Sequence, residues 1–138
     1  MCIFTIICFK NLPLHKTHTK RNNTTMDKAS RYEAMILEII TRIVGVKYSN
    51  EPELRNELIA DTKNHRYQVN MMGWDKEGNR VHRCLIHIDI IDGKIWVQEN
   101  WTEIDPGREL VYKGVPPSDI VVGFLTPKMR ELSDYAIA

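Results

Sequence analysis

An Asp92-Gly93 pair separates two runs of β-forming residues near the middle of the chain. Asp-Gly at such a position favours a two-residue hairpin turn, because that turn requires positive φ angles that Asp and Gly tolerate. We therefore predict an antiparallel hairpin from residues 81–91 and 94–101. If the protein carries out metal or acid–base chemistry, the hairpin also holds the side chains for it: His82, His87, Asp89, Asp92 and Lys94.

The segment before the hairpin predicts one long helix and two further strands. Residues 27–44 carry apolar side chains at the three-and-four spacing of a single helical face: Tyr32, Met35, Ile36, Ile39, Ile40 and Ile43. Residues 57–61 and 66–75 have strand patterns, and the second alternates apolar with polar side chains. We expect an α+β fold in which the helix packs on a four-stranded antiparallel meander.

The segment after the hairpin predicts short helices. Residues 106–114 read as a helix closed by a glycine, and Thr126-Pro127 is a typical helix start. The apolar run 120–125 is a candidate to return toward the sheet. No internal repeat is visible, and we interpret residues 26–138 as a single domain.

The net charge of +1 conceals an asymmetry between the two parts of the chain. The four bases of residues 1–25 have no acidic counterpart, which leaves 15 bases against 18 acids in residues 26–138, a net charge of −3. Broad contact with nucleic acid phosphates needs clustered Lys and Arg. The mildly acidic body therefore argues against independent nucleic acid binding, although a local basic face remains open.

Residues 1–25 look unlike the rest of the chain. Their apolar run from Cys2 to Phe9 is too short for a membrane span, which needs about 20 residues. The polar stretch that follows has no periodicity, so we expect a disordered extension, and translation starting at Met26 is our working hypothesis. Cys84 is the single cysteine of the body, and the absence of any Cys-x-x-Cys pair favours a reducing cytoplasm. The short apolar run leads us to expect no membrane anchor.

Two catalytic interpretations of the hairpin compete with structural ones. Asp92-Gly-Lys94 resembles half of a metal nuclease motif, but the turn already explains the Asp-Gly pair. His87 and Asp89 lie two residues apart, so they share a strand face, which we expect Arg83 to share as well. They could ligate a metal together with Asp92 or act as a general base, whereas a hydrogen-bonded polar cluster within the sheet is the interpretation we favour.

The tryptophans allow either core packing or partner binding. Trp74 and Trp101 lie near predicted strand ends, where a ring can seal the core or anchor a partner, and both interpretations stay open. Trp96 lies inside a strand, and we expect it in the core.

Several short motifs occur in a distinctive order along residues 26–138: Tyr32-Glu-x-Met-Ile-Leu-Glu-Ile-Ile40, Asp61-Thr62, His65-Arg-Tyr-Gln68, Gly73-Trp74, Arg80-Val-His82, the run Cys84 to Gln98, Gly114-Val-Pro116 and Tyr135-Ala-Ile-Ala138. In order and spacing they closely resemble the XisI family of fdxN-element excision controlling factors, which is found chiefly in cyanobacteria. The resemblance implies a small α+β protein, encoded beside a nuclease-like XisH partner, that takes part in DNA excision by a separate recombinase. It implies no catalytic residue and no cofactor.

Two positions depart from the family pattern. Phe124-Leu125 stands where the resemblance leads us to expect Phe-His, so any role of that histidine is absent here. Pro106-Gly107 is a second departure, which we expect to reshape the loop before the next helix.

These observations together predict a non-enzymatic accessory protein that binds an XisH-like protein and contacts DNA through a recombination complex. The candidate interface residues are His87, Asp89, Arg83, Trp74 and Trp101. Direct DNA binding is the first alternative, and its candidate contacts are Arg66, Arg80, Arg83 and Lys94. A metal enzyme at His87, Asp89 and Asp92 is the second. Self-association is a further expectation, because a meander leaves edge strands that must be covered.

Overall fold

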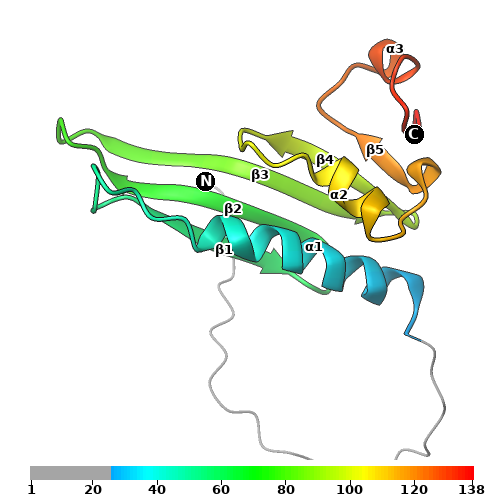
Figure 1. Ribbon diagram of the computed structural model, residues 1–138, viewed down its shortest axis with the longest axis horizontal. Helices are drawn as coiled ribbons and strands as arrows, with labels where there is room; N and C mark the ends of the chain where they lie inside the picture. The colour runs from blue at the N-terminus through cyan, green and yellow to red at the C-terminus, as the bar shows by residue number, and fades with distance from the viewer. Residues whose placement is uncertain (1–25) are drawn as a thin grey trace, which may run out of the picture.

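The computed structural model describes residues 26–138, and the predictions about residues 1–25 lie outside the described part of the chain. Figure 1 shows one mixed sheet with the two longer helices along one side of it. In sequence order the elements are α1 (Lys28–Val44), β1 (Arg55–Asp61), β2 (Arg66–Trp74), β3 (Arg80–Ile91), β4 (Lys94–Asn100), α2 (Pro106–Tyr112), the 3-10 turn η1 (Pro117–Asp119), β5 (Ile120–Val122) and α3 (Pro127–Arg130).

Helix α1 forms as the apolar spacing predicts. Asp27 caps its start by accepting a hydrogen bond from the Ser30 N–H at 2.7 Å, and Gly45 caps its end. The buried side chains of the helix form one stripe: Tyr32, Ile36, Ile39, Ile40 and Ile43. No helix among residues 26–138 is both long and apolar enough to cross a membrane.

The predicted meander is present from β1 to β4, in which each strand pairs antiparallel with the next. At the central turn Asp92 has a φ of 50° and Gly93 a φ of 74°, the two positive angles that a type I′ turn requires. His65, in the turn between β1 and β2, also has a positive φ, of 56°. The hairpin that the Asp-Gly pair predicts is therefore confirmed.

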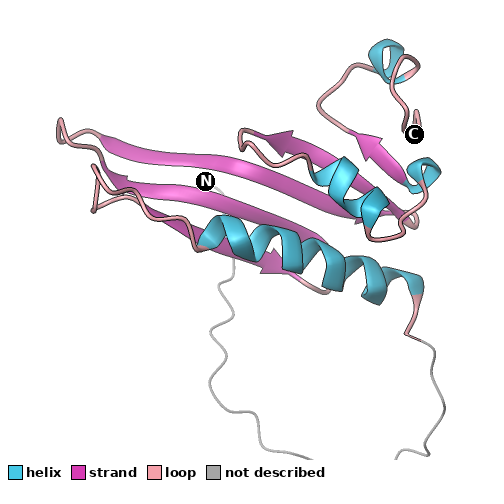
Figure 2. Ribbon diagram, in the orientation of Figure 1, coloured by secondary structure: helices cyan, strands magenta, loops and turns pink. Residues whose placement is uncertain are grey.

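The sheet has a fifth strand beyond the four predicted. β5 runs parallel to β4, with Ile95 opposite Ile120 and Val97 opposite Val122. The chain reaches it through α2, which crosses from the end of β4 to the start of β5 (Figure 2). A strand of three residues has too little sequence pattern to be recognised locally, so the run 120–125 showed only its apolar character.

The core lies between the sheet and helices α1 and α2, which pack on one face of it (Figure 1). Tyr67 and Val69 of β2 and Ile86 and Ile88 of β3 are fully buried there, together with Leu110 of α2. The Tyr67 hydroxyl reaches α1 and donates a hydrogen bond to Glu33. Burying such side chains contributes roughly 1.5–3 kcal/mol each, so this layer supplies the main stabilisation of the fold.

Two bulges interrupt the alternation of the central strands. Val69 lies opposite Ile86 but Asn70 lies opposite Cys84, so Leu85 is an extra residue in β3. A second irregularity places His87 opposite Glu99 while Ile88 faces Val97, which makes Gln98 the extra residue of β4. Beyond each bulge, side chains at even and odd positions exchange faces of the sheet.

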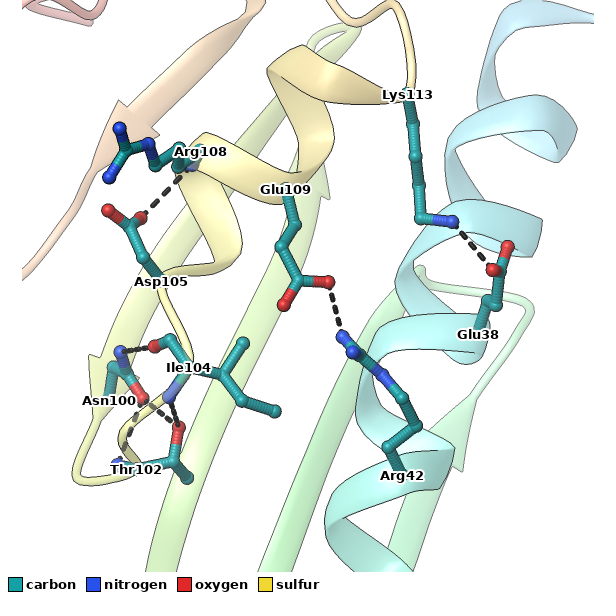
Figure 3. Close-up of polar contacts among 9 residues, drawn as sticks. All are labelled: Glu38, Arg42, Asn100, Thr102, Ile104, Asp105, Arg108, Glu109 and Lys113. Carbon is teal, nitrogen blue, oxygen red and sulfur yellow. Dashed lines mark hydrogen bonds and ion pairs between the residues drawn. The ribbon is translucent and has the colours of Figure 1, made fainter.

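Polar contacts hold α2 and the preceding loop against the rest of the domain (Figure 3). Glu109 of α2 pairs with Arg42 of α1, and Lys113 pairs with Glu38 at 2.6 Å. In the loop, Asn100 accepts hydrogen bonds from both the amide and the hydroxyl of Thr102 and donates to the Ile104 carbonyl at 2.8 Å. Two ion pairs therefore tie α2 to α1, and hydrogen bonds within the loop fix the segment that leads into α2.

Removing the cap of α2 is expected to lower the free energy of unfolding by about 1 kcal/mol. Asp105 accepts the Arg108 N–H at 3.0 Å, and Asp105→Ala leaves that donor to water. Urea unfolding followed by circular dichroism measures the difference. Asp105→Asn is the matched control, because an amide oxygen also caps, and an equal loss in both variants would contradict the capping role.

Candidate functional site

The face of the sheet opposite α1 and α2 carries mostly polar side chains. Residues directly opposite one another in antiparallel strands share a face, so the register assigns each side chain to this surface or to the core. We call this surface the polar face and define it by Glu57, Arg66, Gln68, Asn70, Trp74, Arg80, His82, Cys84, His87, Asp89, Trp96 and Gln98.

Asp89 is the centre of a hydrogen-bonded network on the polar face. His87 Nε2 lies 2.8 Å from Asp89 Oδ1, and Gln98 Nε2 donates to Asp89 Oδ2 at 3.1 Å. Arg66, directly opposite on β2, places Nη1 3.4 Å from Asp89 Oδ2. Asp89 is only 5% exposed even though it lies on the face opposite α1 and α2. Its neighbours therefore both shield its charge and pair it, as a buried carboxylate requires.

Sequence reasoning placed His87 and Asp89 together but missed two of their partners. Arg66 comes from β2, and its contact depends on the cross-strand register. Gln98 reaches Asp89 because the β4 bulge adds a residue at that position. Neither contact leaves a local signal in the sequence.

The prediction that Arg83 shares this face is wrong. Arg83 lies opposite Met71, whose side chain is in the core cluster, so Arg83 belongs to the helix side of the sheet near its far end. The reason is the Leu85 bulge, which reverses the alternation between Arg83 and His87. The same bulge places His82 and Cys84 on the polar face.

The geometry does not assemble the candidate metal site. Asp92 lies in the turn beyond β3, and no group of three or more His, Cys, Asp or Glu side chains within residues 26–138 is arranged to hold a metal ion. Cys84 is half-buried, and burial raises the pKa of its thiol, with a smaller contribution from the charge of Glu99. A raised pKa favours the protonated thiol, so Cys84 is poorly suited to act as a nucleophile.

One buried polar atom on this face has no partner. Asn70 is 8% exposed, and its Oδ1 is buried without a hydrogen bond among the described residues. It lies opposite Cys84 on one side and Glu57 on the other.

The tryptophans take three different places. Trp74 is 51% exposed at the end of β2, with the Arg80 guanidinium 5.6 Å from its ring centre. Trp101 is 75% exposed just after β4. Trp96 was expected in the core, but it lies half-buried on the polar face, where the Arg130 guanidinium sits 5.1 Å from its ring centre. Exposure thus favours partner contact for Trp74 and Trp101.

The basic residues considered for DNA binding are dispersed. Arg66 is paired with Asp89, Arg80 also donates to the Gly73 carbonyl at 3.1 Å, and Lys94 donates to the carbonyl of the C-terminal Ala138. Arg83 lies on the other side of the sheet. The four cations therefore do not form one continuous basic patch.

The two departures from the family pattern have clear positions. Pro106 is the first residue of α2, where its missing N–H costs nothing, and Gly107 lies against the Tyr135 ring so closely that a Cβ would be 2.9 Å from its hydroxyl oxygen. Phe124 is 53% exposed between β5 and α3.

Comparison with known proteins agrees with this architecture. The family model described as XisI protein matches residues 26–137. A solved structure of a XisI-like protein from Anabaena variabilis is 39% identical, with a TM-score of 0.72 over 80% of this chain and 99% of that one. The fdxN element excision controlling factor XisI of the same organism is 33% identical, with a TM-score of 0.70 over 81% of this chain and 100% of that one.

Comparison with curated proteins gives no match. The family match spans most of the chain, and both solved relatives are covered almost completely. The resemblance read from the motifs is therefore confirmed, and the chain belongs to the XisI family.

Proposed function

We propose that this protein controls the excision of a DNA element by binding an XisH-like protein, and that the polar face is the binding surface. The observation that carries the proposal is the similarity to the excision controlling factor XisI over 81% of this chain. Nothing in the polar network needs a catalytic role, because the contacts of Asp89 are those of a satisfied buried carboxylate.

The surface itself supports protein binding. Partner-binding surfaces are enriched in Trp and Arg, and the exposed Trp74 with Arg80 stacked on it supplies both. Toward the other end of β2 and β3, Asp89 and its partners hold polar side chains in fixed positions, which reduces the entropy lost on binding. The polar face thus carries an aromatic anchor at one end and a preorganised polar cluster at the other.

Direct DNA binding is less well supported. Phosphate contacts need free cations side by side, and three of the four candidate bases already have partners while the fourth faces the other way. The net charge of −3 over residues 26–138 points in the same direction.

Trp74→Ala is expected to weaken binding to the XisH-like product of a neighbouring gene at least about ten-fold, because buried tryptophans dominate protein interfaces. Isothermal titration calorimetry with the purified partner measures this. Tyr112→Ala is the matched control: Tyr112 is an aromatic on α2 with 93% exposure, away from the polar face. Equal affinities for the Trp74→Ala variant and the unmodified protein would contradict the assignment of the face.

A gel-shift titration across salt concentrations tests the role itself. Binding of the protein to DNA only when the partner is present supports the adaptor role. Steeply salt-sensitive binding of DNA by the protein alone would instead support direct DNA binding and overturn the proposal.

A further inference from the structure

The two edges of the sheet are unequal. At one edge β5 has three residues, and the C-terminal segment lies beside it, with the Ala136 N–H donating to the Ile120 carbonyl at 2.9 Å and Ala136 bridging Val121. At the other edge β1 has seven residues and pairs with β2 on one side only. Among the described residues β1 is thus the long strand with a free side, and such edges are templates for further strand pairing.

The backbone of β1 offers hydrogen-bonding groups outward at alternate residues. The His65 carbonyl accepts a hydrogen bond from the Ile90 N–H at 3.0 Å. Because the backbone groups of successive strand residues point to opposite sides, the N–H and C=O groups of the odd-numbered residues of β2 point toward β3. Even-numbered residues of β2, such as Gln68, therefore bond β1, where Gln68 lies opposite Ile59. The groups that point away from β2 consequently belong to Asn56, Leu58 and Ala60.

The side chains of β1 are complementary to a second copy of themselves. In an antiparallel pair centred on Leu58, each Leu58 faces the other copy's Leu58, and Arg55 faces Asp61 on the same side of the sheet. The symmetry makes this Arg–Asp contact twice. Leu58 is 40% exposed in the single chain, so the pairing also covers apolar surface at the centre.

Neighbouring registers are disfavoured by charge. A shift that centres the pair on Glu57 places the two Glu57 side chains opposite each other. A shift that centres it on Ile59 places Glu57 opposite Asp61. A register that places Leu58 opposite residue 57 or 59 of the other copy would turn core-facing side chains to the polar side. Of these registers, only the one centred on Leu58 pairs opposite charges. A register centred on Asn56 would pair Arg55 with Glu57, but it joins only residues 55–57 of the two seven-residue strands.

Both charged groups are available for this contact. Arg55 Nε is 2.6 Å from Glu57 Oε1, but a guanidinium has five N–H donors and can bind a second carboxylate. Asp61 accepts a hydrogen bond from the Asn64 side chain at 2.7 Å, and this bond, with those from the Asn64 and Lys63 amides, holds the pKa of Asp61 below its usual range. Asp61 is therefore ionised at neutral pH.

We propose that two copies of this chain associate through their β1 strands, antiparallel and centred on Leu58, to form one continuous sheet. The symmetry axis is perpendicular to the sheet, so the polar faces of both copies lie on the same side. A seven-residue edge buries less than the roughly 1,200 Å² or more typical of stable complexes, so we expect a dissociation constant of roughly 10 µM to 1 mM. The proposal is independent of the XisH-like partner.

Charge reversal tests the register. Sedimentation velocity of the full chain from about 1 µM to 1 mM should show a reversible dimer. Arg55→Asp and Asp61→Arg are each expected to weaken self-association at least about ten-fold, because each places like charges opposite one another. An equimolar mixture of the two variants should dimerise again, since the carboxylate introduced in one variant then faces the guanidinium introduced in the other.

The mixture also serves as the folding control. Asp61→Arg removes the turn contacts with Lys63 and Asn64, so a loss of dimer by that variant alone could reflect damage to the hairpin. Restored dimerisation excludes that cause. A monomer at all concentrations of the unmodified protein, or two variants that still dimerise alone, would overturn the proposal.

A disulfide trap identifies the occupant of the edge. Directly opposite residues in a hydrogen-bonded pair have Cα atoms about 5.5 Å apart, a distance that a disulfide spans. Leu58→Cys should therefore yield a dimer linked from residue 58 to residue 58, identified by mass spectrometry of the digested protein. A link from residue 58 to Cys2 or Cys8 of the same chain would show that residues 1–25 take this edge instead, and would refute the dimer.

Discussion

Gly73→Ala is expected to lower the free energy of unfolding by about 3–5 kcal/mol, a large fraction of the roughly 5–15 kcal/mol typical of a small domain. Gly73 lies in β2 with a φ of 139°, and a Cβ there would be 1.9 Å from the Glu53 carbonyl oxygen. That contact is with backbone, which cannot rotate away as a flexible side chain can. The segment leading into β1 would have to move, and the midpoint of urea unfolding should fall accordingly.

Gly78→Ala is the matched control for the backbone contribution. Gly78 has a φ of 82° in the turn between β2 and β3, but a Cβ there meets nothing within 4 Å. Gly78→Ala should therefore lower the free energy of unfolding only by the cost of the positive φ, about 1 kcal/mol. Similar losses in the two variants would mean that the close approach of Glu53 to Gly73 does not constrain the fold.

The second large effect is a loss of stability at alkaline pH. Tyr32 is 5% exposed, and burial, reinforced by its 2.5 Å hydrogen bond to Asp119 and the charge of that carboxylate, raises its pKa to about 12. The folded state therefore keeps the phenol proton when the unfolded chain releases it near pH 10. The contribution of Tyr32 to the free energy of unfolding is fully present below about pH 10. The free energy of unfolding should then fall by about 2–3 kcal/mol between about pH 10 and pH 12.

Chemical denaturation at several pH values measures this loss. Tyr32→Phe should flatten part of the decline, because no proton remains to be released at that site. Tyr67 contributes in the same direction, since burial and its hydrogen bond to Glu33 also raise its pKa, so the decline should not vanish. Tyr112→Phe, at a 93% exposed ring, should leave the curve unchanged. Identical curves for the Tyr32→Phe variant and the unmodified protein would contradict the assignment.

Local chemistry explains which elements the sequence predicts well. The Asp92-Gly93 turn and the apolar stripe of α1 each depend on residues close together in the chain. Such features can be recognised without knowing which segments pack against them. The structure confirms them, with bounds shifted by only a residue or two.

The features that the sequence does not reveal depend on distant segments. β5 is a strand only because β4 lies beside it, and three residues leave no periodicity to detect. The bulge at Leu85 arises from the match between β2 and β3, and without it a strict alternation wrongly joins Arg83 to His87.

The candidate site shows the same division. The pairing of His87 with Asp89 follows from their spacing on one strand, whereas Arg66 and Gln98 join them only through cross-strand register. Trp96 was misplaced for a related reason, because the side of the sheet that a strand residue occupies is set by helices elsewhere in the chain.

The order of the strands has a consequence for how the protein folds during synthesis. From β1 to β4 each strand pairs with its neighbour in the sequence, so each pairing closes only a short loop at little entropic cost. Helix α1 is made first, but the strands that cover its apolar stripe come later in the chain. Until β2 and β3 have paired, that stripe is the surface of the nascent chain most open to chaperones and to aggregation.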